Sequence, residues 1–313
     1  MAAAQFEAAI WFGEKRSKRA AFANHPTGFQ QLGRWLQPHG AASWRVGLES
    51  TGHYGQALAQ WLHEHGHQVH VINPERTTAY ARSIGQRNKT DSADAEMIAA
   101  YTAKHELTRW TPASAEQETL RAYTRTRHQL QQQRQQLANQ LSSAPAVVQP
   151  VFQALIADLD RHLATLEEKI DQHLAAHVVL AEQVRRLSTV KGIGRRTATI
   201  AIAELPTIQP HTDARAICAW VGLTPKRHQS GHTERRAHLS RKGNMYLRDA
   251  LFMPALVAKR YNPLLKTFAQ RLALKGKSNN SILGAIAHKL LRILVGLLKS
   301  NTNFDPNWSP KKT

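Results

Sequence analysis

The chain has 313 residues, 42% of them hydrophobic, a single cysteine (Cys218) and a formal net charge of +20. This length favours two domains, or one domain with a long helical insertion. One cysteine excludes a disulfide framework and fits a reducing cytoplasm. The most apolar stretch, Ile282–Leu298, is interrupted by charged residues, and the first residues lack the pattern of a signal peptide. We therefore expect a cytoplasmic protein with no membrane partner.

The positive charge is concentrated toward the C-terminus. Residues 189–313 hold 22 Lys and Arg against five Asp and Glu, which gives +17 of the total of +20. Such a concentration favours polyphosphate partners, that is, nucleic acids. The alternative is a basic surface with no specific partner.

Residues 1–112 alternate between strand-like and helical patterns. A short apolar run covers Phe6–Phe12, and a second strand-like segment ends at Glu49. The sequence HQVHVINP predicts a further strand, and a helix is expected from about Ser92. Strands that alternate with helices predict a layered α/β domain.

Residues 113–187 have a helical pattern throughout. Leucines and arginines recur near a 3.5-residue spacing on both sides of the interruption SSAPAVVQP. This spacing predicts two long helices, either a coiled-coil hairpin or an oligomerisation arm. Residues 188–300 then have the pattern of a second, all-α domain, and we expect residues 301–313 to be a disordered tail.

The segment STVKGIGRRTATIAIAEL, residues 188–205, places two glycines between helical patterns. Glycines let the backbone turn tightly, and amides at a helix N-terminus can meet a phosphate. The segment predicts a helix-hairpin-helix element that grips a nucleic-acid backbone without reading bases. A plain connection between two helices is the alternative. The residues proposed to contact nucleic acid here are Lys191, Gly192, Gly194, Arg195, Arg196 and Thr197.

A second basic segment extends from Lys226 to Arg248 and holds seven Lys or Arg against one acid. Within it, Ser230 stands before a glycine and can occupy a tight turn. A serine flanked by cations suits attack on a phosphodiester, because the cations stabilise the charge that develops. The alternative is a serine that only occupies the turn. Further candidates are Lys226, Arg227, Arg241 and Lys242 as nucleic-acid contacts, and Ser240 as a cap or phosphate contact.

Three carboxylates are candidate metal ligands. Glu49 ends a strand-like segment, and Asp91 and Asp94 share a face at the start of the expected helix. Carboxylates at a strand end and a helix start can converge on one or two Mg²⁺ ions, which serve phosphoryl transfer. The alternative for Asp91 is a helix-start acid favoured by the macrodipole. The 17 histidines include four in WLHEHGHQVH, namely His63, His65, His67 and His70, which lack zinc-site spacing and which we interpret as solvated surface residues.

Taken together, these motifs resemble those of the IS one-ten family of insertion-sequence transposases, relatives of the Piv DNA invertases. The resemblance extends from about Phe6 to Leu298, with the motifs in the family's order. The matching segments are GLESTGHYGQALAQWLHEHGHQVHVINP, NKTDSADAEMIAAY, TVKGIGRRTATIAIAEL, WVGLTPKRHQSG and LSRKGNMYLRDAL.

The resemblance implies a ribonuclease H-like N-terminal domain of the Holliday-junction-resolvase type, with an Asp-Glu-Asp-Asp tetrad that holds Mg²⁺. Three members of that tetrad correspond to Glu49, Asp91 and Asp94, and the family's nucleophile corresponds to Ser230. The implied reaction is DNA recombination through a covalent phosphoserine, guided by a structured bridge RNA that pairs with donor and target DNA.

The resemblance also implies partners. The coiled-coil segment would join subunits into a dimer or tetramer, in which metal and serine from different chains form composite sites. The basic residues of 189–300 would hold RNA and DNA backbones. The protein would act at the nucleoid of a bacterial cytoplasm, on insertion-sequence ends and their target.

The first Asp of the tetrad is a departure from the family pattern. Phe6–Ile10 matches the segment that follows this Asp, so its position falls immediately before Met1. Glu7 fits the second strand, and we interpret it as a surface residue. We therefore expect a missing metal ligand and an unpaired backbone ladder in the core. Either the true start lies upstream, or this is a truncated, decayed copy.

Three functions are compatible with these motifs. The first is an RNA-guided transposase or recombinase that uses Mg²⁺ and a serine. The second is a Holliday-junction nuclease that uses metal-activated water and no serine. The third is a nucleic-acid-binding remnant without catalysis.

Overall fold

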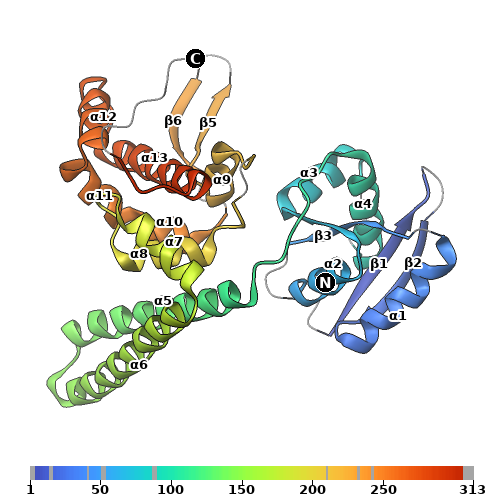
Figure 1. Ribbon diagram of the computed structural model, residues 1–313, viewed down its shortest axis with the longest axis horizontal. Coiled ribbons are helices and arrows are strands. Elements are labelled where there is room, and N and C mark those ends of the chain that lie inside the picture. Colours follow the sequence, from blue (N-terminus) through green and yellow to red (C-terminus); the bar gives the residue numbers. More distant parts are fainter. Residues whose placement is uncertain are drawn as a thin grey trace. The chain divides into compact units, whose positions relative to one another are not determined.

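The computed structural model describes residues 4–13, 17–40, 42–50, 54–86, 90–208, 211–230, 233–240 and 243–305, and only the backbone of 226–230 and 233–238. The chain divides into two compact units, unit 1 (Met1–Pro112) and unit 2 (Ala113–Thr313) (Figure 1).

Unit 1 combines strands and helices, which confirms its expected mixed α/β character. Its strands are β1 (Gln5–Trp11), β2 (Ser17–Ala23), β3 (Arg45–Glu49) and β4 (Gln68–Ile72). Its helices are α1 (Pro26–Leu36), the short η1 (Gln37–His39), α2 (Gln56–Glu64), α3 (Pro74–Ser83) and α4 (Asp91–Lys104).

The strands of unit 1 form two separate two-stranded sheets. β1 and β2 pair antiparallel, and β3 and β4 pair in parallel, with Arg45 opposite Gln68 and Glu49 opposite Ile72. Among the described strands, none pairs with the second edge of β1 or of β3. The single sheet of a ribonuclease H-like fold is therefore not present in this part of the chain, and that fold stays a prediction.

Helices cover both faces of β1. Phe6 and Ile10 point into a core that also contains apolar residues of α1 and α2. The ring of Trp11, which points the other way, lies 5.5 Å from the ammonium of Lys104 at the end of α4. Because successive side chains of a strand alternate between its faces, α1 and α2 lie on one face of β1, and α4 lies on the other.

The same alternation holds in β3. Val46 and Leu48 pack against the core formed with α1 and α2. Gly47 faces α4 so closely that a Cβ there would lie 1.9 Å from the hydroxyl of Thr102. Glu49 is two residues from Gly47 and therefore lies on the α4 face of the strand.

Unit 2 is mainly helical. Its helices are α5 (Ala115–Ser143), the short η2 (Ala146–Val148), α6 (Gln149–Ala176), α7 (Val178–Ser188), α8 (Arg195–Glu204), α9 (Ala214–Val221), α10 (Met245–Ala250), α11 (Phe252–Tyr261), α12 (Pro263–Leu274) and α13 (Asn279–Ser300). Its strands are β5 (Pro225–Ser230) and β6 (Thr233–Leu239).

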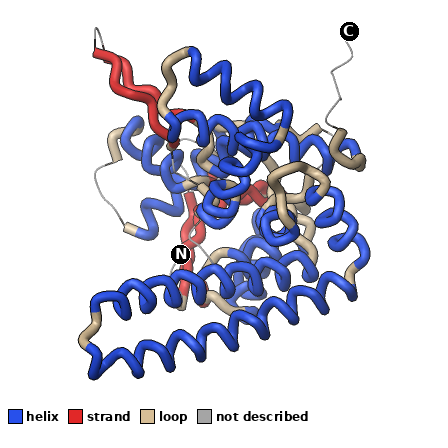
Figure 2. Tube along the Cα trace, turned by 90° about the vertical axis from the view of Figure 1, so that its left-hand side faces the viewer, coloured by secondary structure: helices blue, strands red, loops and turns tan. Residues whose placement is uncertain are grey.

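The two long helices expected in 113–187 are α5 and α6, which lie side by side and antiparallel (Figure 2). Ion pairs fix this register. Arg134 Nε lies 2.5 Å from Asp160 Oδ1, and Arg127 Nε lies 2.6 Å from Glu167 Oε1 nearer the base of the hairpin. Whether this hairpin forms a coiled coil that joins subunits stays a prediction.

The core of unit 2 is built around α13. Leu290, Leu291, Leu294 and Val295 are fully buried there, among apolar residues of α7, α8, α9 and α11. Within the described chain, α13 alone is long and apolar enough to cross a membrane, but half of its most apolar window is buried inside unit 2. The structure therefore accounts for its apolar sequence as core packing.

Two expectations about unit 2 were wrong. Its C-terminal part is not all-α, because β5 and β6 form an antiparallel hairpin between α9 and α10. The predicted tail also begins too early. The amide of Phe304 donates to Thr189 Oγ1 at 2.9 Å, and the Phe304 side chain packs against the core. Residues 306–313 lie outside the described chain.

Candidate active site and nucleic-acid interface

The first turn of α4 carries two of the candidate carboxylates. Thr90 is the N-cap, and its hydroxyl accepts from the amide of Ala93 at 3.2 Å. Asp91 and Asp94 follow, where the helix dipole favours negative charge. Asp94 Oδ1 accepts from Gln86 Nε2 at 3.1 Å. The helix start therefore explains acids at this place, but it does not require two of them.

Glu49 is the last residue of β3 and is only partly exposed. Its Oε1 accepts from the hydroxyl of Thr77 at 2.8 Å, and Thr77 is buried in α3. The carboxylate is thus held at the carboxyl end of a strand, on the face of the strand that α4 covers.

One cavity of about 560 Å³ joins these groups. Glu49, Asp91 and Asp94 all border it, and so does Glu7 of β1. Glu49 and Asp91 are 42 positions apart in sequence, so the fold brings them to one cavity. Within the described residues, however, no three His, Cys, Asp or Glu side chains come close enough to hold one metal ion. The carboxylates have the donor chemistry that Mg²⁺ prefers, but three of them do not converge on one point.

Two of these carboxylates are held by partners that no sequence motif indicates. Thr77 and Gln86 lie in other segments of the chain, 28 and eight positions from the acids they contact. Only the packing of α3 and its following loop against β3 and α4 brings them into place.

The predicted helix-hairpin-helix segment consists of α7, a turn and α8. Gly192 in the turn has φ +106°, and a Cβ there would lie 3.0 Å from the Cβ of Ala258. Gly194 is the N-cap of α8 and provides no side-chain acceptor for the first amides of the helix. Lys191 is exposed, and Thr197 is half-buried. These features are compatible with a phosphate contact, and the element's role stays a prediction.

The two arginines at the start of α8 already have partners. Arg195 Nη2 lies 2.7 Å from Asp171 Oδ1, and Arg196 Nη2 lies 2.5 Å from Glu167 Oε1. Both acids project from α6. Burial opposes ionisation of Glu167, yet the hydrogen bond and charge of Arg196, together with Arg127, hold its pKa below its usual range. These acids were not predicted from the sequence, although their i, i+4 spacing on one helix was a visible signal.

Ser230 is the last residue of β5 and lies opposite Thr233 of β6. Lys226 and Arg227 precede it on the same strand. Arg241 and Lys242 lie outside the described residues. The backbone therefore places the candidate nucleophile at the end of a hairpin with basic residues along β5.

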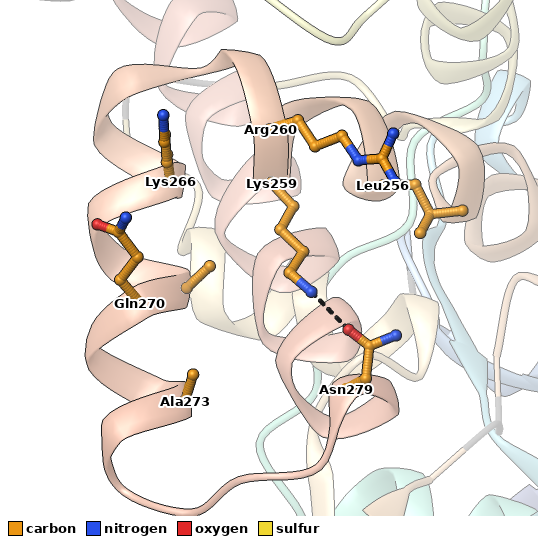
Figure 3. Close-up of a pocket in the computed structure, with 8 residues that line it drawn as sticks. Leu256, Lys259, Arg260, Lys266, Gln270, Ala273 and Asn279 are labelled. Carbon is orange, nitrogen blue, oxygen red and sulfur yellow. Dashed lines mark hydrogen bonds between the residues drawn. The ribbon is translucent and has the colours of Figure 1, made fainter.

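Unit 2 also has a basic hollow of about 350 Å³ that no sequence motif indicates. Lys259 and Arg260 come from α11, and Lys266 and Gln270 come from α12 (Figure 3). The ammonium of Lys259 donates to Asn279 Oδ1 at 2.5 Å, at the start of α13. None of the described residues that line this hollow carries a carboxylate. The concentration of charge in 189–313 was the only sequence signal for it.

Comparison with known proteins matches both parts of the chain to transposases. Residues 1–148 match a family described as "Transposase", of the DEDD type, and residues 184–270 match the family described as "Transposase IS116/IS110/IS902 family". The "Pilin gene-inverting protein" of Moraxella bovis is 30% identical over 293 residues, which cover 92% of this chain and 91% of that protein. This chain belongs to the IS110 family of transposases.

Two further relatives agree with this assignment. A "Probable family 20 transposase" of Pseudomonas aeruginosa is 28% identical to this chain over 271 residues, which cover 75% of this chain and 78% of that protein. The "Transposase for insertion sequence element IS1328" of Yersinia enterocolitica is 28% identical over 255 residues, which cover 71% of this chain and 74% of that protein. The predicted resemblance is confirmed, and with it a DNA-acting transposase or recombinase of insertion sequences. DEDD transposases are typically metal-dependent.

Proposed function

We propose that this transposase cleaves and exchanges DNA strands under the guidance of a structured RNA, with a carboxylate site in unit 1 and Ser230 as nucleophile. The observation that carries the proposal is the cavity that Glu49, Asp91 and Asp94 share. Three acids chosen from sequence motifs border one cavity, on the face of β3 that α4 covers.

The carboxylates are proposed to hold Mg²⁺ through Glu49, Asp91 and Asp94. A bound Mg²⁺ would act as a Lewis acid toward phosphodiester oxygens. Thr77 would keep Glu49 oriented by its hydrogen bond, and Gln86 would do the same for Asp94. Glu7 is a further carboxylate that borders the cavity.

Ser230 is proposed to attack a DNA phosphorus atom through its hydroxyl oxygen. The new serine–phosphate ester bond would form as the bond from phosphorus to a deoxyribose oxygen breaks, and the proton lost by the serine would be balanced by the one gained by the leaving oxygen. Basic residues on the same hairpin, Lys226 and Arg227, are suited to stabilise the charge on the phosphate. Reversal of the step with another strand's hydroxyl would complete the exchange.

Unit 2 is proposed to hold the nucleic acids. The turn before α8, the hairpin β5–β6 and the hollow that contains Lys259 and Lys266 are the proposed contacts with a phosphate backbone. Arg241 and Lys242 are proposed from the sequence alone. The bridge RNA and the assembly into a dimer or tetramer are further parts of this proposal, and they rest on the family resemblance.

A plasmid recombination assay tests the proposal. The full chain is supplied with insertion-sequence ends, a target, Mg²⁺ and the RNA encoded beside its gene. We expect Ser230→Ala to abolish exchange, a loss on the order of a thousandfold or more for a removed nucleophile, and Ser240→Ala to leave most of it. Glu49→Gln should also abolish exchange, whereas Glu96→Gln, which alters another acid of α4, should not.

Other outcomes would support other functions. Cleavage that survives Ser230→Ala but not Glu49→Gln would indicate a junction nuclease that uses water. RNA binding with no cleavage by the wild-type chain, at any Mg²⁺ concentration, would indicate a nucleic-acid-binding remnant. Exchange that does not require the RNA would contradict the guided part of the proposal.

A further inference from the structure

Glu204 is a carboxylate of unit 2 in a place where neither its helix nor its surroundings favour negative charge. It is the last residue of α8, and its side chain is 1% exposed. The C-terminus of a helix carries a partial negative charge, and burial removes the water that would solvate a carboxylate. An acid is therefore disfavoured here for two reasons, and the contacts that hold it come from other elements.

The first part of α5, at the base of the helical hairpin α5–α6, supplies two of these contacts. Arg125 donates to Glu204 from Nε at 2.7 Å and from Nη2 at 2.8 Å. Gln117 and Arg121 precede Arg125 at four-residue intervals and donate to backbone carbonyls at the same end of α8. α5 thus provides donors and positive charge to the C-terminus of α8 and holds the two helices together.

A third contact joins Glu204 to the start of α10. Asn244 Nδ2 donates to Glu204 Oε2 at 2.6 Å. Asn244 Oδ1 accepts from the amide of Leu247 at 2.9 Å, so the same side chain is the N-cap of α10. The cap directs the amide oxygen toward α10 and leaves the amide nitrogen for the carboxylate. One side chain therefore links the end of α8 to the start of α10.

Asn244 also lies at the base of the hairpin β5–β6. The amide of Ser240, just after β6, donates to the carbonyl of Thr224, just before β5, at 3.0 Å. The amide of Asn244 donates to the carbonyl of Trp220, near the end of α9, at 3.3 Å. Gly243 has φ +122°, and a Cβ there would lie 1.8 Å from this same carbonyl oxygen, so the close approach requires glycine. The base of the hairpin is thus attached where Asn244 is held.

We propose that a bridge of three residues, Arg125, Glu204 and Asn244, fixes the direction of the hairpin β5–β6 relative to the helical hairpin α5–α6. The bridge thereby positions Ser230, the last residue of β5. A buried ion pair contributes little net stability compared with apolar packing, and its best-attested use is to specify one geometry. The three are positioning residues, and this inference rests on the proposed role of Ser230 as nucleophile.

The length of β5 makes the position of Ser230 sensitive to the base of the hairpin. From Pro225 to Ser230 the strand advances five residues, or about 17 Å. A tilt of about 10° at the base would therefore move Ser230 by about 3 Å, and a misplacement of about 1 Å can slow a reaction about a hundredfold. Loss of the bridge should accordingly lower the rate of the chemical step more than the affinity for nucleic acid.

Isosteric substitutions break the bridge and leave the cap of α10 in place. Asn244→Asp keeps an oxygen that accepts from the amide of Leu247, but it sets a second carboxylate against Glu204. The double variant with Glu204→Gln exchanges acid and amide between the two positions, so a donor again meets an acceptor and the net charge equals that of the wild type. Glu118→Gln is the control, since Glu118 pairs with another arginine of α5, Arg121, outside the bridge.

Two measurements on the full chain compare these variants. Spin labels at Gln132→Cys in α5 and Thr233→Cys in β6, with the single native cysteine replaced by Cys218→Ala, give the distribution of distances between the two hairpins. Trapping of the serine–DNA adduct in unlabelled chains, with Mg²⁺, insertion-sequence DNA and the RNA encoded beside the gene, gives the rate. We expect Asn244→Asp to widen or shift the distribution by about 3 Å, and to slow adduct formation about a hundredfold at saturating DNA. The double variant should recover most of both, and Glu118→Gln should change neither.

Three results would overturn the proposal. The first is a distance distribution that Asn244→Asp leaves unchanged. The second is an adduct rate that stays at the wild-type level although the distribution widens. The third is a rate that falls only at low DNA concentration, since it would indicate a binding defect. No adduct from the wild-type chain would contradict the proposed function instead, and the distance distributions would then decide whether the bridge fixes the hairpin.

Discussion

The two units of this transposase differ in how completely they close their own cores. In unit 2, the side chains of α13 that face the core are enclosed by other helices, and Leu290, Leu291 and Leu294 have no exposed surface. In unit 1, a cavity of about 560 Å³ passes between the two sheets, and Val46 and Leu48 beside it are only half-buried. The difference follows from the backbone. A helix satisfies its own hydrogen bonds, whereas a strand needs a neighbour on each edge.

The largest effect we expect is a difference between the same substitution in the two units. Leu290→Ala should reduce the free energy of unfolding of unit 2 by about 2–5 kcal/mol, because a fully packed leucine leaves a cavity. Leu36→Ala in unit 1 should cost less than half as much, since Leu36 already borders empty space. Urea unfolding can separate the units. Five of the seven tryptophans, at positions 11, 35, 44, 61 and 110, lie in unit 1, so their fluorescence reports mainly on it.

Circular dichroism follows the helices of unit 2 in the same experiment. We expect the fluorescence transition to occur at lower urea than the circular dichroism transition. A cost for Leu36→Ala equal to that of Leu290→Ala would contradict the view that unit 1 is the less completely packed unit.

The second effect concerns a buried carboxylate in unit 2. Glu204 is 1% exposed and accepts two bonds from Arg125, at 2.7 and 2.8 Å, and one from Asn244 at 2.6 Å. Glu204→Ala would leave Arg125 without its partner. We expect a loss of about 2–3 kcal/mol in the stability of unit 2, less than for a fully buried pair, because Arg125 is 28% exposed.

The matched control is Glu118→Ala, which removes an acid that pairs with Arg121 within α5 and is 34% exposed. It should cost less than about 1 kcal/mol. Thermal unfolding followed by circular dichroism measures both. Equal losses for the two variants would show that Glu204 has no special place in the packing of unit 2.

The smallest effect concerns competition between Asp171 and a nucleic-acid phosphate for the guanidinium of Arg195. Asp171→Asn removes the carboxylate that pairs with Arg195 at the start of α8. If nucleic-acid phosphate binds there, affinity should rise by about two- to fivefold at low salt, the range expected for an exposed ion pair. Fluorescence anisotropy with a labelled RNA duplex, in about 50 and 200 mM salt, measures it.

Asp158→Asn is the control for this substitution, because Asp158 lies on the same helix α6 and, among the described residues, pairs with Arg161 and His162 of that helix. It removes the same charge far from α8 along the hairpin. An equal rise in affinity for both variants would mean that only net charge matters, and that α8 is not the contact.

The elements that carry the candidate carboxylates could be predicted from sequence because local signals mark them. The strand pattern ended at Glu49, and a helix was expected from about Ser92, with Asp91 at its start. The structure places a strand end and a helix start at those residues. The hairpin β5–β6 was missed for a physical reason. Its sequence is mostly basic and polar, so it lacks the apolar alternation that identifies a strand.

The remaining features depend on contacts between distant segments. The family resemblance predicted an unpaired ladder in the core, and the described strands leave β1 and β3 each unpaired at one edge. It could not predict that helices would enclose the space between them. The ion pairs of Arg195 and Arg196 with α6 are also beyond local patterns, because they depend on how the hairpin α5–α6 packs against α8.

The most direct test of the central claim, that Ser230 carries the chemistry, is to trap the protein–DNA intermediate and locate it by mass spectrometry. Reactions would contain the full chain, insertion-sequence DNA, Mg²⁺ and the adjacent RNA, and would be quenched in denaturant. We predict a nucleotide attached to the peptide that contains Ser230, and no attachment with Ser230→Ala or Glu49→Gln. Cleaved DNA with no attached peptide, or attachment at another residue, would contradict a role for Ser230 as the nucleophile.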